Sequence, residues 1–251
     1  MVGRDVNRSV IITGARGRLG SAMVRAFQTA GWGVWAANRS AAKSQSAVNE
    51  LVLDLTDDAS ITAAVNSVFE SSNPLPDEIA LVANASNREV LNADWQDCDR
   101  SAMHGIFDVD VVGHFLMARA LREAALKQQI KFSVVFIGSI YGMGGVKPDI
   151  YPEGMAPTPI QYSVAKAALT GLTRDLAARW GGDGIRVNCL APGGIFADQD
   201  PRFVKAYSKH TPSGKMAEVE EIADAAVLLC SSKARAISGQ VVCADGGWTA
   251  W

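Results

Sequence analysis

Short apolar runs alternate with longer amphipathic segments along the chain. The runs predict β-strands at Ser9–Thr13, Gly33–Ala37, Glu78–Ala83, Phe132–Ile137, Ile185–Ala191 and Gln240–Ala244. Between them, apolar residues recur at helical spacing, as at Leu169, Leu172 and Leu176. Strands that are apolar on both faces need cover on both sides, so the alternation predicts a parallel sheet between two layers of helices.

No linker, internal repeat or low-complexity run interrupts this pattern. We therefore expect residues 1–251 to form a single α/β domain, a Rossmann-type doubly wound parallel sheet of about seven strands with helices on both faces. Residues 142–160 have the glycine and proline content of a loop, which we expect to lie on the substrate side. Residues 196–215 are expected to form a lid over the substrate.

Composition narrows the class of partner. The 251 residues carry a formal net charge of −2, which leaves no basic surplus for nucleic acid or an anionic membrane. The start of the chain is polar, and no apolar run approaches the roughly 20 residues of a membrane span. The four cysteines form no C-x-x-C pair, and the three histidines lack metal-ligand spacing. We expect a cytoplasmic protein with reduced thiols, no metal and a small-molecule ligand.

A glycine-rich turn follows the first predicted strand. It reads Thr13-Gly14-Ala15-Arg16-Gly17-Arg18-Leu19-Gly20 and opens a helix, whose N–H groups and dipole can hold a pyrophosphate. A tight strand-to-helix connection without a ligand would carry the same glycines. The turn alone therefore does not decide between the two.

The end of the second predicted strand bears on the choice of dinucleotide. An NAD site usually places an acid there, about 20 residues after the turn, but this chain has Asn38, Arg39 and Ser40. A guanidinium binds a 2′-phosphate in fixed geometry, and Arg16 or Arg18 could supply a second cation. We expect NADP(H) in preference to NAD(H), with a solvated surface arginine as the alternative reading of Arg39.

A phenol and an ammonium stand at i and i+4 in Tyr162-Ser163-Val164-Ala165-Lys166. On one helix face they would lie about 5–6 Å apart at Cβ. A phenol is a poor base at neutral pH, but a cation a few ångströms away stabilises its phenolate, which would make Tyr162 a usable acid and base. Such a pair also arises by chance, so its context has to support it.

That context resembles the short-chain dehydrogenase/reductase family over nearly the whole chain. The matching signals are the turn Thr13–Gly20, Asp54-Leu55, Asn84-Ala85, Gly138-Ser139, Tyr162 with Lys166, Arg186-Val187-Asn188, Pro192-Gly193 and Asp245-Gly246-Gly247. Their order and spacing follow the family pattern.

The resemblance implies a role for each position. Ser139, Tyr162, Lys166 and Asp110 would form the catalytic set, with Ser139 donating a hydrogen bond to the substrate oxygen. The dinucleotide would contact Gly14, Arg16, Gly17, Arg18, Leu19, Gly20, Asn38, Arg39, Asp54, Leu55, Asn84, Ala85, Ser86, Tyr162, Lys166, Pro192, Gly193 and Ile195.

Four positions depart from the family pattern. Arg18 takes the slot of the second turn glycine, Ser86 replaces a glycine, and Ala197 replaces a threonine near the carboxamide. Asp110 stands where the family usually carries an asparagine that holds a water linking the lysine to solvent. We expect Asp110 to keep this relay role with an altered pH optimum, because its charge would lie near Lys166.

The function expected from these signals is that of an NADP(H)-dependent carbonyl reductase or alcohol dehydrogenase. Ser139-Ile140-Tyr141-Gly142 and Pro192–Phe196 are similar to a subgroup linked to bacterial surface-sugar and flagellin modification, which implies a polar, sugar-like substrate. A set of cations could meet a phosphorylated or carboxylated substrate or could simply be solvated: Arg88, Lys205, Lys209, His210 and Lys215.

Two other functional classes stay open. One is a non-redox scaffold or regulatory protein that binds a dinucleotide, suggested by the changes at Arg18, Asp110 and Ala197. The other is an epimerase or dehydratase that uses its dinucleotide transiently. In either case the resemblance implies a homotetramer or homodimer, assembled through long helices expected at Trp95–Gln128 and Ile160–Trp180.

Overall fold

Seven parallel strands form one sheet in a computed structural model that describes residues 6–41, 48–91 and 95–251. Their order is β3-β2-β1-β4-β5-β6-β7, which confirms the predicted doubly wound α/β fold in one domain. The bounds are β1 Arg8–Thr13, β2 Gly33–Asn38, β3 Asn49–Val52, β4 Glu78–Ala83, β5 Lys131–Ile137, β6 Arg186–Pro192 and β7 Val241–Ala244. Six of these strands match predicted runs. The sequence analysis missed β3, which is four residues long and mostly exposed.

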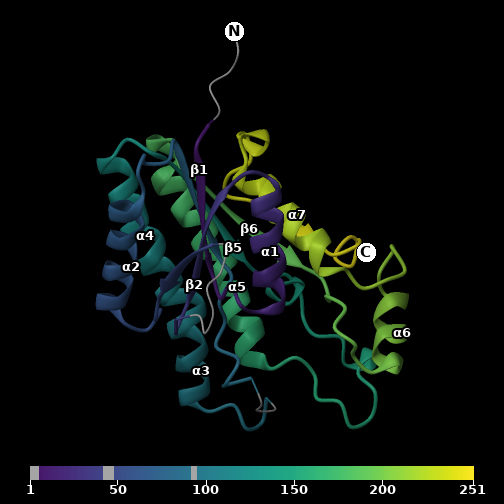
Figure 1. The fold of residues 1–251 in the computed structure, drawn as a ribbon. Helices are drawn as coiled ribbons and strands as arrows, with labels where there is room; N and C mark the ends of the chain where they lie inside the picture. The colour runs from purple at the N-terminus through teal and green to yellow at the C-terminus, as the bar shows by residue number, and fades with distance from the viewer. Residues whose placement is uncertain (1–5, 42–47, 92–94) are drawn as a thin grey trace.

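Helices cover both faces of the sheet (Figure 1). One layer contains α1 and α7, and the other contains α2, α4 and α5. The α-helices are α1 Arg18–Thr29, α2 Asp58–Ser71, α3 Arg100–Phe107, α4 His114–Lys127, α5 Ile160–Trp180, α6 Pro201–Lys209 and α7 Val219–Cys230. Short helical turns are η1 Asp108–Gly113, η2 Ile140–Gly142, η3 Pro148–Ile150, η4 Gly181–Asp183 and η5 Ser232–Ala234.

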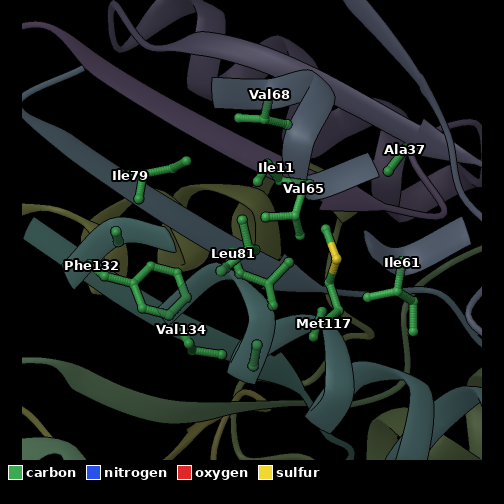
Figure 2. Packing of buried hydrophobic residues seen from close by; sticks show 14 of the residues in the cluster. Ile11, Ala37, Ile61, Val65, Val68, Ile79, Leu81, Met117, Phe132 and Val134 are labelled. Carbon is green, nitrogen blue, oxygen red and sulfur yellow. The ribbon is translucent and has the colours of Figure 1, made fainter. Parts of the chain in front are cut away.

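Alternating side chains of the strands fill two separate cores. In β1, Ile11 packs toward α2 and α4, whereas Val10 and Ile12 pack toward α1 and α7. Figure 2 shows Val65 of α2 and Met117 of α4 turned toward the sheet. Burial of each such side chain stabilises the fold by about 1.5–3 kcal/mol, so both layers hold the strand ends firmly in place.

The long helix expected at Trp95–Gln128 is wrong in two respects. The helix begins at Arg100, because the Asp99 side chain accepts a hydrogen bond from the Ala102 N–H and so caps α3. It is then interrupted by η1, a π-helical turn that separates α3 from α4. Gly113 ends that turn in close contact with Leu55, whose carbonyl oxygen would lie 2.3 Å from a Cβ at position 113. Such turns are rare and are often found at functional sites.

A half-buried arginine at the start of β6 contacts the segment that follows α7. The Arg186 guanidinium, at the start of β6, donates hydrogen bonds to the carbonyl oxygens of Leu229, Cys230, Ser231, Ala234 and Ile237. Burial lowers the pKa of Arg186. These carbonyls belong to the end of α7 and the segment after it, so a single side chain fastens that segment to the sheet.

The carboxyl ends of the central strands meet along one edge. The strand order reverses between β1 and β4, and open α/β sheets bind ligands outside the strand ends at such a point. Gly14 follows β1, Asn84 follows β4, and Ser139 lies just after β5. The fold therefore gathers most of the predicted site residues at this edge.

Candidate active site

The structure holds Lys166 of α5 in a fixed, buried position. Its Nζ forms an ion pair with Asp110 Oδ2 at 3.0 Å and donates a hydrogen bond to the Ile137 carbonyl oxygen at 3.0 Å. The same Nζ lies 5.4 Å from the centre of the Tyr162 ring. The ammonium is therefore held by one carboxylate and one carbonyl oxygen beside the Tyr162 ring.

The buried carboxylate keeps Lys166 charged. Burial by itself would lower the pKa of Lys166, but the Asp110 carboxylate and the Tyr162 phenol oppose this, and the net shift is upward. Asp110 is fully buried within η1, and its Oδ1 accepts a hydrogen bond from the Asn87 N–H at 3.0 Å. Asp110 therefore contacts the lysine directly.

Ser139 lies at the start of η2, directly after β5. Its Oγ accepts a hydrogen bond from the Tyr141 N–H at 3.2 Å, and the residue is buried. The turn rests on α5: a Cβ added at Gly142 would come within 2.6 Å of the Lys166 carbonyl oxygen. The predicted serine is thus on a turn packed against the helix that carries Tyr162 and Lys166.

Backbone segments approach one another closely at the glycine-rich turn. Gly14 has φ +65°, and a Cβ there would lie 2.9 Å from the Ala85 Cα. A Cβ at Gly20 would come within 2.2 Å of the Gly14 carbonyl oxygen, so α1 begins tightly against the turn. Gly17, the N-cap of α1, offers no side-chain cap, which leaves the first helical N–H groups suited to an anion.

The side chains of Thr13, in β1, and of Asn84, which follows β4, support this turn. The Asn84 amide donates to the Thr13 carbonyl oxygen at 2.9 Å, and the backbone N–H groups of Asn84 and Ala85 donate to Thr13 Oγ1 at 2.9 and 3.0 Å. The Asn84 side chain therefore holds the protein backbone, which is a structural task in addition to the ligand contact expected for it.

A histidine that the sequence analysis left as an ordinary core or surface residue joins the two regions. His114 Nδ1 lies 3.1 Å from the Asp110 carbonyl oxygen, and Nε2 lies 2.9 Å from Thr13 Oγ1. A carbonyl can only accept, so Nδ1 carries the proton and Nε2 accepts from the Thr13 hydroxyl. Burial lowers the pKa of His114 to about 4, which keeps this arrangement neutral. Only its helical position next to Asp110 could have signalled this role.

Arg16 and Arg39, the cations expected near the end of β2, lie in that region. Each forms an ion pair with a glutamate. Arg16 Nη2 pairs with Glu50 Oε2 of β3 at 3.0 Å, and Arg39 Nη2 pairs with Glu89 Oε1 at 2.8 Å. Asn38 Oδ1 accepts a hydrogen bond from the Arg16 N–H at 3.1 Å. The sequence analysis named both arginines but neither glutamate.

Asp54, expected near the adenine, is engaged locally. Its Oδ1 accepts hydrogen bonds from the Thr56 N–H at 2.9 Å and the Thr56 hydroxyl at 2.7 Å. These bonds lower the pKa of Asp54. The carboxylate thus shapes the turn after β3, while its contact with a dinucleotide stays a prediction.

Known proteins resemble this chain over most of its length. A family model described as enoyl-(acyl carrier protein) reductase matches residues 14–249. A galactitol 2-dehydrogenase (L-tagatose-forming) of Cereibacter sphaeroides is 31% identical over 254 residues, which cover 96% of this chain and 94% of the relative. An inactive 2-(S)-hydroxypropyl-CoM dehydrogenase 2 of Xanthobacter autotrophicus is 30% identical, with coverage of 85% and 90%.

Solved structures give the same result. A short chain dehydrogenase from Leptospira borgpetersenii with bound NAD+ superposes with a TM-score of 0.85 at 27% identity, covering 99% of this chain and 97% of that one. A gluconate 5-dehydrogenase from Burkholderia cenocepacia in complex with NADP and tartrate gives a TM-score of 0.83 at 25% identity, with the same coverage. This chain belongs to the short-chain dehydrogenase/reductase family.

Arg18, which departs from the short-chain dehydrogenase/reductase pattern, contacts the segment after β6. Its guanidinium donates to the Phe196 carbonyl oxygen at 2.7 Å and lies 3.6 Å from Asp198 Oδ2. The side chain that replaces the turn glycine therefore connects the start of α1 to the segment after β6. Asp198 adopts φ +56°, a conformation uncommon for a residue other than glycine.

Gln199 organises the segment in which the family threonine is replaced by Ala197. Its Oε1 accepts a hydrogen bond from the Ala197 N–H at 2.7 Å, and its Nε2 donates to the Ile195 carbonyl oxygen at 2.8 Å. The sequence analysis did not name this glutamine. Its side chain fixes the backbone around Ile195, one of the residues expected to contact the nicotinamide.

The segments expected to form the substrate loop and lid pack on each other through aromatic rings. Tyr151 of the loop contacts Phe203 of α6 with 5.3 Å between ring centres, and Tyr207 of α6 stacks on Trp248 at 4.3 Å. His210 Nε2 also lies 3.5 Å from Asp149 Oδ2. The four aromatic residues Tyr151, Phe203, Tyr207 and Trp248 belong to a third, separate apolar cluster beside η2.

Some of the cations expected to meet an anionic substrate have partners within the protein. Lys215 pairs with Glu221 at 2.8 Å, and His210 with Asp149 as described. The substrate roles of Arg88, Lys205 and Lys209 stay predictions.

Membrane, metal and thiol chemistry can be assessed over the described ranges. Within residues 6–41, 48–91 and 95–251, no helix is both long and apolar enough to cross a membrane. The same residues contain no group of three or more His, Cys, Asp or Glu side chains that could hold a metal ion. All four cysteines are free thiols, and burial raises the pKa of Cys189 to about 11.

Proposed function

We propose that this protein is an NADP(H)-dependent oxidoreductase that interconverts a hydroxyl and a carbonyl group on a polar, sugar-like substrate. The observation that supports it most is the buried Lys166 ammonium, held by Asp110 and Ile137 beside the Tyr162 ring. The names of its relatives, which include dehydrogenases of galactitol and gluconate, favour a sugar alcohol or sugar acid.

The chain's own residues would perform the proton chemistry. The Tyr162 hydroxyl donates its proton to the substrate oxygen during reduction and takes it back during oxidation. The Lys166 ammonium stabilises the phenolate left behind, and Ser139 donates a hydrogen bond to the same substrate oxygen as its charge grows. When bound, the nicotinamide supplies or accepts the hydride. Asp110 keeps Lys166 protonated through the cycle and contributes to its proton relay.

Support for a preference for NADP(H) over NAD(H) comes from the arginines near the end of β2. Arg16 and Arg39 lie at the end of β2, and a guanidinium binds phosphate through two parallel hydrogen bonds. The Gly17 N-cap and the backbone N–H groups that follow it would hold the pyrophosphate. With NADPH as the dinucleotide, we expect reduction of a carbonyl to be the favoured direction in the cell.

A second candidate is a protein that binds the dinucleotide without turnover. It is favoured by the direct Asp110–Lys166 pair, which departs from the family pattern, and by a relative whose name marks it as inactive. This candidate predicts dinucleotide binding with no consumption of NADPH on any carbonyl substrate.

Replacement of Tyr162 by phenylalanine tests the proposal. NADPH consumption would be followed with a panel of keto sugars and keto acids, and NADPH binding by fluorescence. We expect Tyr162→Phe to lower kcat on the order of 10²- to 10⁴-fold, because general acid–base catalysis contributes about that much. NADPH binding should persist. Glu220→Gln, which changes an exposed side chain on α7 in the helix layer opposite that of Tyr162, is the control. Unchanged turnover in Tyr162→Phe would refute the proposal.

A further inference from the structure

Two arginine–glutamate pairs occupy the region where a dinucleotide that carries a 2′-phosphate would differ from one that does not. Arg16, from the glycine-rich turn, reaches Glu50 on β3 and also donates to Ser40 Oγ at 3.3 Å. Arg39, after β2, reaches Glu89, which follows β4. The four side chains come from four separate segments that meet at the end of β2.

The charges of this group cancel. Two guanidinium groups face two carboxylates, so these four side chains together carry no net charge. A phosphate monoester carries a charge of about −1.5 to −2 near neutral pH, and it would compete with both carboxylates for the same donors. The arginines alone therefore do not determine how strongly a 2′-phosphate is bound.

We propose that Glu50 and Glu89 are specificity-determining residues, which reduce the preference of this protein for NADP(H) over NAD(H) by holding the two arginines. This inference rests on the proposed binding of a dinucleotide along the edge of the sheet. Each carboxylate occupies donors that the 2′-phosphate needs and repels the phosphate itself. A dinucleotide with a free 2′-hydroxyl meets neither obstacle.

Glu50 has the stronger effect of the two. Its side chain is 28% exposed and projects from a strand that pairs with β2, whereas the Glu89 side chain is 72% exposed. Less solvent around an ion pair means less screening of its charges. Both pairs remain accessible enough to exchange partners, because exposed ion pairs contribute only about 0.2–1 kcal/mol.

Charge-neutralising substitutions test the inference without any need for turnover. Dissociation constants for NADPH and NADH would be measured by fluorescence titration for the full-length protein and for Glu50→Gln, Glu89→Gln and the double variant. Glu220→Gln is the matched control, since Glu220 forms a similar exposed pair with Arg25 at 3.3 Å, away from the end of β2. Thermal unfolding of each variant would show that the fold is kept.

The readout is the ratio of the NADH to the NADPH dissociation constant. We expect this ratio to rise on the order of two- to fivefold in Glu50→Gln, less in Glu89→Gln, and not at all in Glu220→Gln. The rise should shrink in 0.5 M salt, which on the order of halves the screening length relative to physiological salt.

The outcomes separate the two proposals. A ratio that stays at the wild-type value in Glu50→Gln and Glu89→Gln, or that falls, overturns this inference. A protein that binds both dinucleotides and shifts the ratio but shows no turnover supports the inference and refutes the proposed catalysis. Absence of any dinucleotide binding by the unmodified protein refutes both.

Discussion

His114 links η1, which carries Asp110, to Thr13 at the start of the glycine-rich turn through two hydrogen bonds. Its neutral ring donates to the Asp110 carbonyl oxygen and accepts from Thr13, which in turn supports the backbone of Asn84 and Ala85. A charged ring could no longer accept from Thr13, and it would be buried near the Lys166 ammonium. Protonation should therefore oppose folding.

Substitution of His114 by glutamine should reduce the loss in the free energy of unfolding that occurs as the pH falls. The folded pKa, about 4, lies below the ordinary 6.5, so the unfolded chain binds the extra proton first as pH falls. The wild-type protein should lose about 3 kcal/mol more than the variant between pH 6.5 and pH 4, at about 1.4 kcal/mol per unit. Urea unfolding across this range measures the difference. Parallel profiles would contradict the assignment of a neutral, buried ring.

Asp110→Asn should destabilise the protein and alter its pH–activity profile. Removal of one partner leaves the buried Lys166 charge without its counter-ion, which costs about 3 kcal/mol. The ion pair raises the Lys166 pKa, so its contribution is complete below the ordinary value of 10.5 and is lost only as pH rises through the folded pKa. The expected destabilisation is thus constant from pH 7 to pH 9. The double variant Asp110→Asn/Lys166→Met should recover part of it, and an unchanged activity profile would argue against a relay.

At the scale of single residues, the sequence predicted site residues that stand at a fixed spacing along the chain. It did not predict those whose partners are distant in the sequence. Tyr162 and Lys166 stand four apart on one helix, so their proximity follows from helical geometry. Glu50 and Glu89 meet arginines that are 34 and 50 positions away along the chain. Nothing local in the sequence connects such residues, because the fold alone brings them together.

Among the elements, the loop of residues 142–160 and α6 are joined by aromatic contacts. Phe203 contributes a buried ring between Tyr151 and Tyr207, and the Tyr207 hydroxyl accepts a hydrogen bond from the Gly194 N–H at 2.5 Å. The backbone next to the expected nicotinamide contacts is therefore tied to α6. Movement of α6 should therefore shift the backbone next to the expected nicotinamide contacts.

Phe203→Ala should loosen α6 without unfolding the domain. Loss of a buried phenylalanine costs about 3 kcal/mol, and here the loss falls on a cluster separate from the two main cores. We expect cleavage by trypsin at Lys205 and Lys209 to accelerate on the order of ten- to a hundredfold, because proteolysis follows local opening. Leu228→Ala, at an exposed site on α7, is the control. Equal cleavage rates for the wild-type protein and Phe203→Ala would show that the aromatic cluster does not hold α6 in place.

The elements that the sequence failed to predict are short or irregular. The four residues of β3 give no clear alternation, and a π-helical turn has no distinct apolar period. The longer elements were predictable, since their patterns repeat over several turns or fill both faces of the sheet. Cap geometry such as that of Asp99 fixed the start of α3, whereas the apolar pattern alone suggested an earlier start.

At the scale of the whole molecule, α5, which carries Tyr162 and Lys166, and the adjoining η1 expose a strip of apolar side chains. Ile160 and Val164, on one face of α5, are 43% and 41% exposed, and Val112 of the adjoining η1 is 46% exposed. Such a surface is typical of an interface between subunits. The homotetramer or homodimer expected from the sequence would use this strip.

Val164→Glu should therefore weaken self-association. A buried carboxylate in an apolar interface is costly, so we expect the variant to sediment as a smaller species than the wild-type protein at the same concentration. Leu228→Glu on α7 places the same charge on a different surface and separates a specific effect from a general one. A wild-type protein that sediments as a monomer would remove the basis of this prediction.

The arginine at the start of β6 limits how this fold can be altered. Arg186 presents a planar group to five carbonyl oxygens at once, and a lysine, with three donors around one nitrogen, cannot reproduce that geometry. Replacement of Arg186 by lysine, usually treated as harmless, would remove a donor from the part-buried carbonyl oxygens of Leu229, Cys230 and Ser231. An engineered protein in which residues 229–237 are removed or replaced must therefore supply other acceptors for the Arg186 guanidinium. Without them, its donors would lose their hydrogen-bond partners.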